Sequence, residues 1–495
     1  MVKEELSAKE GKSEPGHGPL CVDLDGTLLR SDSLYEALFD LVRRKLYLIF
    51  FLPFWLRLGK AYFKRRVYEL SDLDVSRLPY REELLTALKA EKARGRRLIL
   101  VTGCHHVLAR KIAEHLGFFD ETFATAGTLN LVGEAKADFL VQRFGVRGFD
   151  YVGNSRADLE VWKQAASAWV VSPKRSLLAA AERCAPIAKS FQEHPAWLPV
   201  LAKALRVHHW SKNFLLFLPL LLSESILERA LWGRCLLAFF SYSFISSSVY
   251  ILNDLLDIEA DRRHPDNRKR PFAAGTLSIP AGLVLAPFLL SLGLGMAWKL
   301  SLAYFAVLLG YFLLTSLYSF RIKQMVMADI ICLATLYTWR IWAGGVVTGI
   351  PISEWFLIFS LFFFMSLAFL KRCAELIVME QTQQKKNSRR AYLVSDLPLL
   401  IGVGLSNAYL SVLVLALYIH DPKVAQQMRY PDLLWALCPL LLYWVSRVWL
   451  KAYRGVMHTD PLVFALRDKA SYLLAFLAGA LWLFARGTLF SAFSF

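Results

Sequence analysis

The sequence predicts a soluble α/β domain followed by an all-α bundle of nine membrane-spanning helices. Three observations lead to this prediction. The chain has 495 residues, too many for one ordinary domain, and 56% of them are hydrophobic, too many for a soluble protein. Short strand-like segments that end in polar residues lie within residues 19–190. Long apolar segments, each able to cross a bilayer, fill residues 196–495.

The net charge indicates what the protein binds, and the cysteines indicate the cellular compartment in which it works. A net charge of +17 in so apolar a chain favours anionic lipid and phosphorylated substrates over nucleic acid. The seven cysteines form no Cys-x-x-Cys pair, which is typical of packing residues in a reducing compartment. Residues 1–18 are polar, are predicted to be disordered and lack the apolar core of a signal peptide. The N-terminal region is therefore expected to stay in the cytoplasm.

The first predicted strand ends in two carboxylates. Residues 19–22 form an apolar stretch, and Asp23 and Asp25 follow it, with Gly26 and Thr27 as a turn. Two aspartates one residue apart at the end of a strand place one carboxylate as a nucleophile and the next as an acid and base, with Mg2+ beside them. This arrangement predicts a phosphoryl-transfer site.

Three more segments complete this pattern. Thr102 ends a second apolar strand and can hydrogen-bond a phosphate oxygen, and Lys136 supplies a cation. Asn154 and Asp158 follow a third strand-like segment. In this order the set resembles the haloacid dehalogenase (HAD) superfamily over residues 19 to about 175. We use the name HAD domain for residues 19–190.

The resemblance implies a Rossmann-like parallel sheet with a small helical cap. It also implies Asp23 as the nucleophile and Asp25 as the acid and base. The residues implied to hold Mg2+ are Asp23, Asp25, Asn154 and Asp158. Active members usually carry Asp at the position of Asn154, which is a neutral and weaker ligand. The sequence therefore leaves two alternatives open, an active phosphatase and a degenerate binding or regulatory module.

An apolar segment interrupts the HAD pattern between its first two strands. Residues 46–56 are apolar, and Lys and Arg flank them on both sides. Eleven apolar residues are too few to span a bilayer, and basic flanks with aromatic residues favour a helix at the membrane interface. The alternative is a buried helix of the cap.

The membrane half contains nine predicted spans. They are residues 213–231, 233–252, 279–297, 301–319, 328–348, 354–371, 397–419, 433–450 and 470–490. Lys and Arg cluster after the second, fourth, sixth and eighth spans, which the positive-inside rule assigns to the cytoplasm. These features predict a multi-pass protein of the cell inner membrane, with the HAD domain and the active sites in the cytoplasm and the C-terminus outside.

A cluster of carboxylates stands where the second span leaves the bilayer. Asp254, Asp257 and Asp261 are spaced i, i+3 and i+7, which puts them on one face of a helix. Three like charges on one face repel, and Mg2+ is the simplest remedy because it also keeps waters and ligand phosphates. The alternative is a solvated loop beside the membrane.

The motif Asn-Asp-x-x-Asp-x-x-x-Asp at residues 253–261, followed by Arg-x-x-Arg-Pro, resembles the first aspartate motif of the UbiA superfamily of membrane prenyltransferases. The longer stretch 253–275 resembles one branch, the polyprenyl-phosphate phosphoribosyltransferases. The resemblance implies catalytic, Mg2+-binding aspartates. Substrate contacts are implied for Asn253, Arg268, Lys269 and Arg270.

Further substrate-site candidates come from later spans and from the segment before the first one. Lys323 is the expected cation for the leaving diphosphate, with Tyr318 and Asp329 on either side of it. Many prenyltransferases carry a second Asp where this chain has Leu333. Arg340 is a cation within a span, expected to meet a ligand or a protein carboxylate, and Lys212 is expected to bind phosphate or anionic lipid.

The resemblance implies a transferase that moves phosphoribosyl from phosphoribosyl diphosphate to a polyprenyl phosphate, in the synthesis of cell-envelope glycan precursors. A HAD domain in the same chain then suggests removal of the 5-phosphate from the product. The alternative is an aromatic polyprenyltransferase of the quinone or haem type with a degenerate HAD module. The expected cofactor is Mg2+.

Overall fold

The structure is a computed structural model of the chain. It describes residues 18–125, 131–172, 174–192, 196–381, 391–426, 428–457, 464–465 and 468–487. The chain packs as two compact units, Met1–Leu205 with Tyr250–Ala286, and Arg206–Val249 with Pro287–Phe495. The disorder predicted for residues 1–18 falls almost entirely on residues 1–17, which lie outside the described part. The predicted domain limits at residues 190 and 196 remain predictions, since packing groups 250–286 with the HAD domain.

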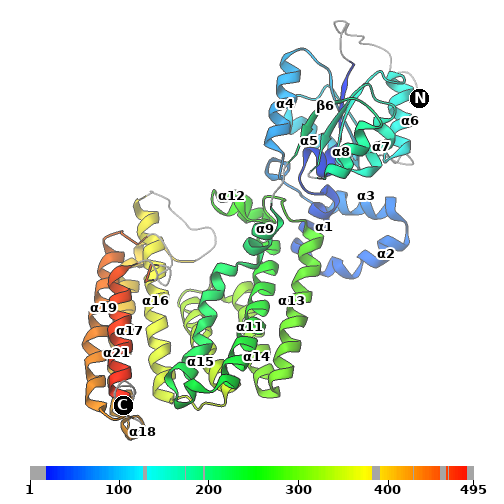
Figure 1. Cartoon of the computed structure of the whole chain (residues 1–495). Coiled ribbons are helices and arrows are strands. Elements are labelled where there is room, and N and C mark those ends of the chain that lie inside the picture. Colours follow the sequence, from blue (N-terminus) through cyan, green and yellow to red (C-terminus); the bar gives the residue numbers. More distant parts are fainter. Residues whose placement is uncertain are drawn as a thin grey trace. The chain divides into compact units, whose positions relative to one another are not determined.

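The first unit is built on a β-sheet flanked by helices (Figure 1). The sheet is parallel and has six strands in the order β3-β2-β1-β4-β5-β6. Its strands are β1 Leu20–Val22, β2 Leu98–His105, β3 Glu121–Thr125, β4 Asp150–Gly153, β5 Ala168–Val171 and β6 Ile187–Phe191. β1 lies in the centre, with Val22 opposite Leu100 of β2 and Val152 of β4. The predicted Rossmann-like sheet is thus confirmed, and the carboxyl ends of β1, β2 and β4 meet at one edge.

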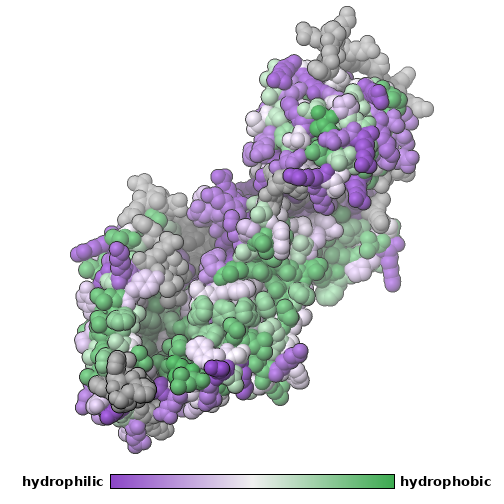
Figure 2. Space-filling model, viewed as in Figure 1, coloured by the Kyte–Doolittle hydropathy of each residue, from purple (hydrophilic) through white to green (hydrophobic). Residues whose placement is uncertain are grey.

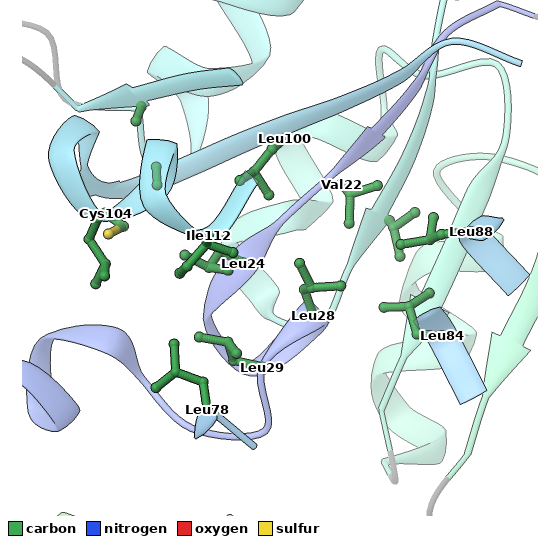
Figure 3. Close-up of a cluster of buried hydrophobic side chains, with 14 of the residues drawn as sticks. Val22, Leu24, Leu28, Leu29, Leu78, Leu84, Leu88, Leu100, Cys104 and Ile112 are labelled. Atoms are coloured by element: carbon green, nitrogen blue, oxygen red, sulfur yellow. The ribbon is translucent and has the colours of Figure 1, made fainter. Parts of the chain in front are cut away.

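Helices cover the sheet and form the cap. They are α1 Ser33–Arg44, α2 Leu52–Arg57, α3 Lys60–Leu70, α4 Glu82–Ala93, α5 His106–Leu116, α6 Glu134–Phe144, α7 Leu159–Trp162 and α8 Arg175–Glu182. Short 3-10 helices are η2 Leu46–Phe50, η3 Val75–Arg77 and η4 Arg156–Asp158. The central strands are apolar on both faces because helices pack on both. Figure 3 shows one of these cores, where Val22 and Leu100 meet Leu84 of α4 and Ile112 of α5.

The same unit includes the segment that carries the aspartate motif. Helix α11 (Arg229–Leu256) ends in it, and α12 (Ile258–Arg263), η7 (Asn267–Lys269) and the start of α13 (Ile279–Leu300) follow. The predicted helix through all three aspartates is wrong in one detail, because it breaks at Asp257 between α11 and α12. The break is small, since the Asp257 N–H still bonds to Asn253 O at 2.9 Å and the Asp261 N–H to Asp257 O at 2.7 Å.

The second unit is helical. Its further long helices are α14 Leu302–Phe320, α15 Ala328–Thr348, α16 Glu354–Gln381, α17 Leu397–His420, α19 Leu437–Tyr453 and α21 Lys469–Arg486. Shorter helices are α9 Trp197–Leu205 in the first unit, η5 Val207–Phe217, α10 Leu218–Leu222, η6 Glu224–Leu227, η8 Ile322–Gln324, η9 Val394–Asp396, α18 Pro422–Gln426 and η10 Pro431–Ala436. Figure 2 shows apolar residues over the visible face of the long helices, as a lipid-facing surface requires.

Eight helices of the described residues are long and apolar enough to cross a membrane, one fewer than predicted. The missing one is the first predicted span, residues 213–231, which is divided among η5, α10, η6 and the first residues of α11. The chain leaves the helical conformation at Ser223, where φ is −91 and ψ is 168, and again at Glu228, so no single long helix forms there. The chain is a multi-pass membrane protein. The predicted position of its C-terminus outside the membrane stays a prediction.

Candidate active sites

Asp23 lies at the carboxyl end of β1, at the centre of the first candidate site. Its side chain is buried, and Lys136 Nζ from the first turn of α6 lies 2.7 Å from Oδ1. Thr27 donates from Oγ1 to Oδ2 across 3.1 Å. Strand β1 and the start of α6 therefore bring the predicted nucleophile and the predicted cation together, although 113 positions separate them in the chain.

Asp25 is held by the start of the cap. Its Oδ1 accepts a hydrogen bond from the backbone N–H of Ser33, the first residue of α1, at 2.7 Å. Between the two aspartates and the cap, Gly26 has φ +73, and a Cβ there would lie 2.1 Å from Asn154 Nδ2. Only glycine fits, because the turn needs a left-handed backbone and the amide of Asn154 fills the space.

Burial dominates the electrostatics of this site. It raises the pKa of Asp25 to about 7, with the nearby Asp32 charge adding to the effect. Burial also raises the pKa of Asp23, against the opposing effect of Lys136. Burial lowers the pKa of Lys136, but the charges of Asp23 and Asp158 outweigh it, so that the pKa is raised. A carboxylic acid at position 25 can therefore carry a proton near neutral pH.

Tyr151 was missed by the sequence reasoning. Its hydroxyl accepts from Lys136 Nζ at 2.9 Å and donates to Asp158 Oδ1 at 2.9 Å. The signal was available, because Tyr151 stands on the buried strand β4, two residues before Gly153, where a large polar side chain needs a partner. It links two of the predicted site residues.

The remaining predicted residues of this site take different positions. Thr102 is buried, and its Oγ1 accepts from the Cys104 N–H at 3.0 Å. Asp158 Oδ2 accepts three bonds, from the Asn154 and Ser155 N–H groups and from Ser155 Oγ, at 3.0, 2.8 and 2.8 Å. Asp158 thus organises the loop after β4.

The residues present suit a small, hard cation. No cluster of three His, Cys, Asp or Glu arranged for a metal occurs among the described residues. However, Asp23 Oδ2 and Asn154 Oδ1 both lie 3.1 Å from the same hydroxyl, Thr27 Oγ1. Two oxygen ligands converge there, and Mg2+ needs only one or two from the protein because it keeps waters and substrate phosphates.

The second candidate site is the aspartate motif. Asp254 and Asp261 are almost fully buried, and Arg270 Nη1 lies 3.1 Å from Asp254 Oδ1 and 2.8 Å from Asp261 Oδ2. One guanidinium nitrogen therefore holds the first and last carboxylates of the motif. Their oxygens also suit Mg2+ chemically, and the arginine already supplies positive charge between them.

The other predicted residues of this motif lie close to these carboxylates along the chain. Asp257 stands at the helix break, and its N–H bonds to Asn253 O. Arg268 and Lys269 lie on η7 and are exposed. Exposed cations beside buried carboxylates can meet the phosphates of a soluble ligand.

In the second unit, Asp329 forms an internal ion pair. Arg372 Nε donates to Asp329 Oδ2 at 2.9 Å, and the hydroxyl of Tyr392 donates to Oδ1. Arg372 is 2% exposed, and within the described part of the chain its Nη2 has no hydrogen-bond partner. Sequence reasoning did not assign a role to Arg372. The signal that could have found it is its position directly after the predicted span 354–371, where a charged side chain needs a partner.

Arg340 is buried on α15 in a ring of tyrosines. Its Nε donates to Asn213 Oδ1 and its Nη2 to Tyr311 Oη, each at 3.0 Å. The guanidinium carbon lies 5.1, 5.2 and 5.5 Å from the ring centroids of Tyr242, Tyr311 and Tyr337. Cation–π interactions and hydrogen bonds therefore help to stabilise the buried charge.

Lys212 shares one of these rings, because its Nζ lies 5.4 Å from the centroid of Tyr337. The structure thus brings together two predicted cations, Lys212 and Arg340. Tyr318 stands in the last turn of α14 and Lys323 on η8, both partly buried.

The chain combines a carboxylate–lysine site on a parallel sheet with an aspartate motif at the end of a spanning helix. This combination defines a class of membrane-embedded enzymes that carry a hydrolase-like domain. The chain belongs to the UbiA prenyltransferase family, which matches residues 214–458, and residues 20–163 match the haloacid dehalogenase-like hydrolase family. Both family resemblances predicted from the motifs are confirmed.

Three relatives place the chain more closely. It is 34% identical over 475 residues to the uncharacterized protein y4nM of Sinorhizobium fredii, covering 94% of this chain and 91% of that one. It is 36% identical to the nodulation protein NoeC of Azorhizobium caulinodans, covering 57% of this chain and 92% of that one. It is 35% identical to decaprenyl-phosphate phosphoribosyltransferase of Corynebacterium glutamicum, covering 37% of this chain and 57% of that enzyme.

Proposed function

We propose that the membrane half transfers phosphoribosyl from phosphoribosyl diphosphate to a polyprenyl phosphate. The observation that carries this proposal is the buried Asp254–Arg270–Asp261 cluster with Arg268 and Lys269 exposed beside it. The identity with decaprenyl-phosphate phosphoribosyltransferase supports the same reaction. A phosphoribosyl donor carries more phosphate charge than a prenyl donor, which suits a motif with three adjacent cations.

The proposed reaction needs charge stabilisation more than a strong base. An oxygen of the acceptor phosphate forms a bond to C1 of the ribose while the bond from C1 to the diphosphate oxygen breaks. The electron pair leaves with the diphosphate, so negative charge grows there and positive charge grows on the ribose. Arg268 and Lys269 bind phosphate charge, and the role predicted for Lys323 stays a prediction. Mg2+ held by Asp254, Asp257 and Asp261 would add positive charge at the leaving group.

We propose that the second unit holds an anion-binding region for the acceptor. Arg340 and Lys212 share the Tyr337 ring, and Arg372 offers a buried donor beside Asp329. A phosphate oxygen is the ligand that such charged donors prefer. We assign the headgroup of the polyprenyl phosphate to this region, with its chain among the spanning helices.

We propose that the HAD domain removes the 5-phosphate of the product. The Asp23 carboxylate attacks phosphorus, the bond from phosphorus to the ribose oxygen breaks, and protonated Asp25 gives its proton to that oxygen. Water, deprotonated by Asp25, then releases phosphate and restores Asp23. Thr102 binds a phosphate oxygen and Lys136 offsets charge. Asp23, Asp25 and Asn154 would hold Mg2+, and Asp158 positions their loop.

The HAD domain and both active sites are proposed to face the cytoplasm. Loops rich in Lys and Arg follow α11, α14, α16 and α19, so α11 begins on the outer side. The chain between the HAD domain and Arg229 then has to cross the bilayer, and the C-terminus lies outside. A membrane-impermeant thiol reagent applied to intact cells should label Leu227→Cys and spare Val456→Cys; the reverse pattern contradicts this topology.

The transfer is tested with radiolabelled phosphoribosyl diphosphate and polyprenyl phosphate in membranes that contain the protein. Label should enter the lipid phase with the wild type and not with Asp254→Asn. A parallel reaction with a labelled allylic diphosphate and an aromatic acceptor should yield no product. Product only in the parallel reaction would instead establish an aromatic polyprenyltransferase.

A further inference from the structure

The cap exposes an unusual number of large apolar side chains between α1 and α3. The apolar residues at least 37% exposed there are Tyr47, Ile49, Phe50, Phe51, Phe54, Leu56, Leu58 and Tyr62, and Phe50 reaches 82%. We call Tyr47–Leu58 the cap segment. So many exposed aromatic and aliphatic groups in one short segment mark a binding surface.

The cap segment is folded and has two faces. Its inner face, with Leu48 and Trp55, packs against Leu41 of α1 and the partly buried Phe63 and Leu70 of α3. The outer face carries the exposed side chains. The inner face agrees with the predicted alternative of a buried cap helix, and the exposed outer face leaves the interfacial alternative open.

Charge favours a bilayer as the partner. Residues 43–66 contain eight Lys or Arg and no Asp or Glu: Arg43, Arg44, Lys45, Arg57, Lys60, Lys64, Arg65 and Arg66. Apolar side chains bordered by cations suit the headgroup region of a bilayer with anionic lipid. The apolar helical stretch Tyr47–Arg57 would be about 16 Å long, far short of the ~30 Å needed to cross.

The base of the cap segment lies at the end of a spanning helix. Arg43, just before the segment, donates from Nη1 to Leu256 O at 3.4 Å and from Nη2 to Glu259 at 2.9 Å. Leu256 is the last residue of α11, and all three residues belong to the same compact unit. A helix that leaves the membrane at Leu256 therefore brings the start of the cap segment to the membrane surface.

We propose that the outer face of the cap segment inserts into the cytoplasmic headgroup region of the bilayer and binds anionic phospholipid. This contact holds the Asp23 site beside the membrane surface, where a phosphate on a lipid carrier would be presented. The contact itself does not depend on which group the membrane half transfers.

The test uses the full chain in nanodiscs. Cys184 and Cys438, the two partly exposed native cysteines among the described residues, are first replaced by Ser. A polarity-sensitive dye is then attached to Phe50→Cys or Phe54→Cys, whose native side chains are 82% and 58% exposed. The matched control is Val146→Cys, which replaces a side chain 64% exposed in the loop before β4.

The dyes at positions 50 and 54 are expected to shift to the blue and to be quenched several-fold more by spin-labelled lipid than the dye at 146. Quenching should be stronger with phosphatidylglycerol present than in phosphatidylcholine alone. Equal quenching at all three positions would overturn the membrane contact. Stronger quenching at 50 and 54 that is the same in both lipids would overturn the role of anionic lipid.

Discussion

The side chain of Arg270 holds together the first and last carboxylates of the aspartate motif. Its Nη1 contacts two carboxylates that are 2% and 1% exposed, while the arginine itself is 28% exposed. Removing a partner from such a group leaves buried charge behind, which costs more than the pair contributes. The arginine therefore serves both the fold and the proposed phosphate site.

Arg270→Ala should destabilise the protein by on the order of 3–5 kcal/mol, because two buried carboxylates lose an ion-pair partner. Thermal unfolding in detergent measures the effect. The control is Arg268→Ala, which removes an exposed cation on η7 and should change stability by less than about 0.5 kcal/mol. Equal melting temperatures for the two variants would contradict the assignment.

Asp25→Asn should stabilise the HAD domain above neutral pH. Burial raises the pKa of Asp25 to about 7 in the folded protein. In the unfolded chain this carboxyl group ionises from about pH 4 upward, whereas in the folded protein it keeps its proton up to about pH 7. The wild type loses stability as pH rises through this window, and neutral Asn does not. The variant's advantage, up to about 4 kcal/mol, should be present at pH 8 and absent near pH 4 in chelator. An Asn variant less stable at pH 8 would refute the burial argument.

The partners of some residues could be predicted from the sequence, and those of others could not. Asp23 and Lys136 could be paired from the sequence only through the HAD resemblance, which implies a cation beside the nucleophile, because Lys136 lies on a helix 113 positions away. Tyr151 and Arg270 could not be placed in the same way. Whether a tyrosine bridges two charges, or an arginine turns to carboxylates instead of solvent, depends on side-chain directions that only the packed structure defines.

Among the elements, α1 of the cap has a double attachment. Its first N–H binds Asp25, and one turn later Glu36 forms a two-pronged ion pair with Arg262 at 3.1 and 2.7 Å. Arg262 stands on α12 beside Asp261 and also donates to Ala273 O at 3.0 Å. The helix thus links Asp25, the proposed acid–base residue of one site, to the aspartate motif of the other.

A double-mutant cycle with Glu36→Gln and Arg262→Gln should give a coupling free energy of roughly 1–3 kcal/mol, since both side chains are less than 10% exposed. The exposed pair Arg65–Glu69 on α3 is the control and should give less than about 0.5 kcal/mol. Both cycles are read by thermal unfolding. A buried pair that couples no more than the exposed one would rule out a structural link.

Gly344 allows α15 to approach η5 closely. A Cβ at this position would lie 2.2 Å from Leu216 O, which is backbone and cannot turn away. Gly344→Ala should therefore cost about 1–3 kcal/mol. Gly402→Ala on α17, where a Cβ would meet nothing within 4 Å, should be neutral or slightly stabilising. A variant at 344 as stable as the one at 402 would contradict the close packing.

The helices show which elements the sequence can predict. Eight of the nine predicted spans form continuous helices because their hydropathy and length leave no other stable form in lipid. Residues 213–231 are also rich in Leu and Phe, yet the chain leaves the helical conformation at Ser223 and again at Glu228, which divides them. Hydropathy averages over a window and does not register where the backbone leaves the helix.

In the whole molecule, one chain would carry out two successive reactions. The membrane half would make a lipid-linked phosphoribose, and the HAD domain would remove its phosphate and so draw the first reaction forward. The cap segment at the membrane surface would give the second site access to a lipid-borne substrate. Each half has its own aspartate site, so each reaction can be abolished separately.

The most direct measurement is mass spectrometry of the lipid product formed by purified protein from phosphoribosyl diphosphate and polyprenyl phosphate with Mg2+. The wild type should yield polyprenyl-phosphoryl ribose without a 5-phosphate. Asp23→Asn should accumulate the same lipid with its 5-phosphate, and Asp254→Asn should form neither. A wild type that forms no pentose-linked lipid would contradict the transfer. A product identical in the wild type and Asp23→Asn would contradict the coupled dephosphorylation.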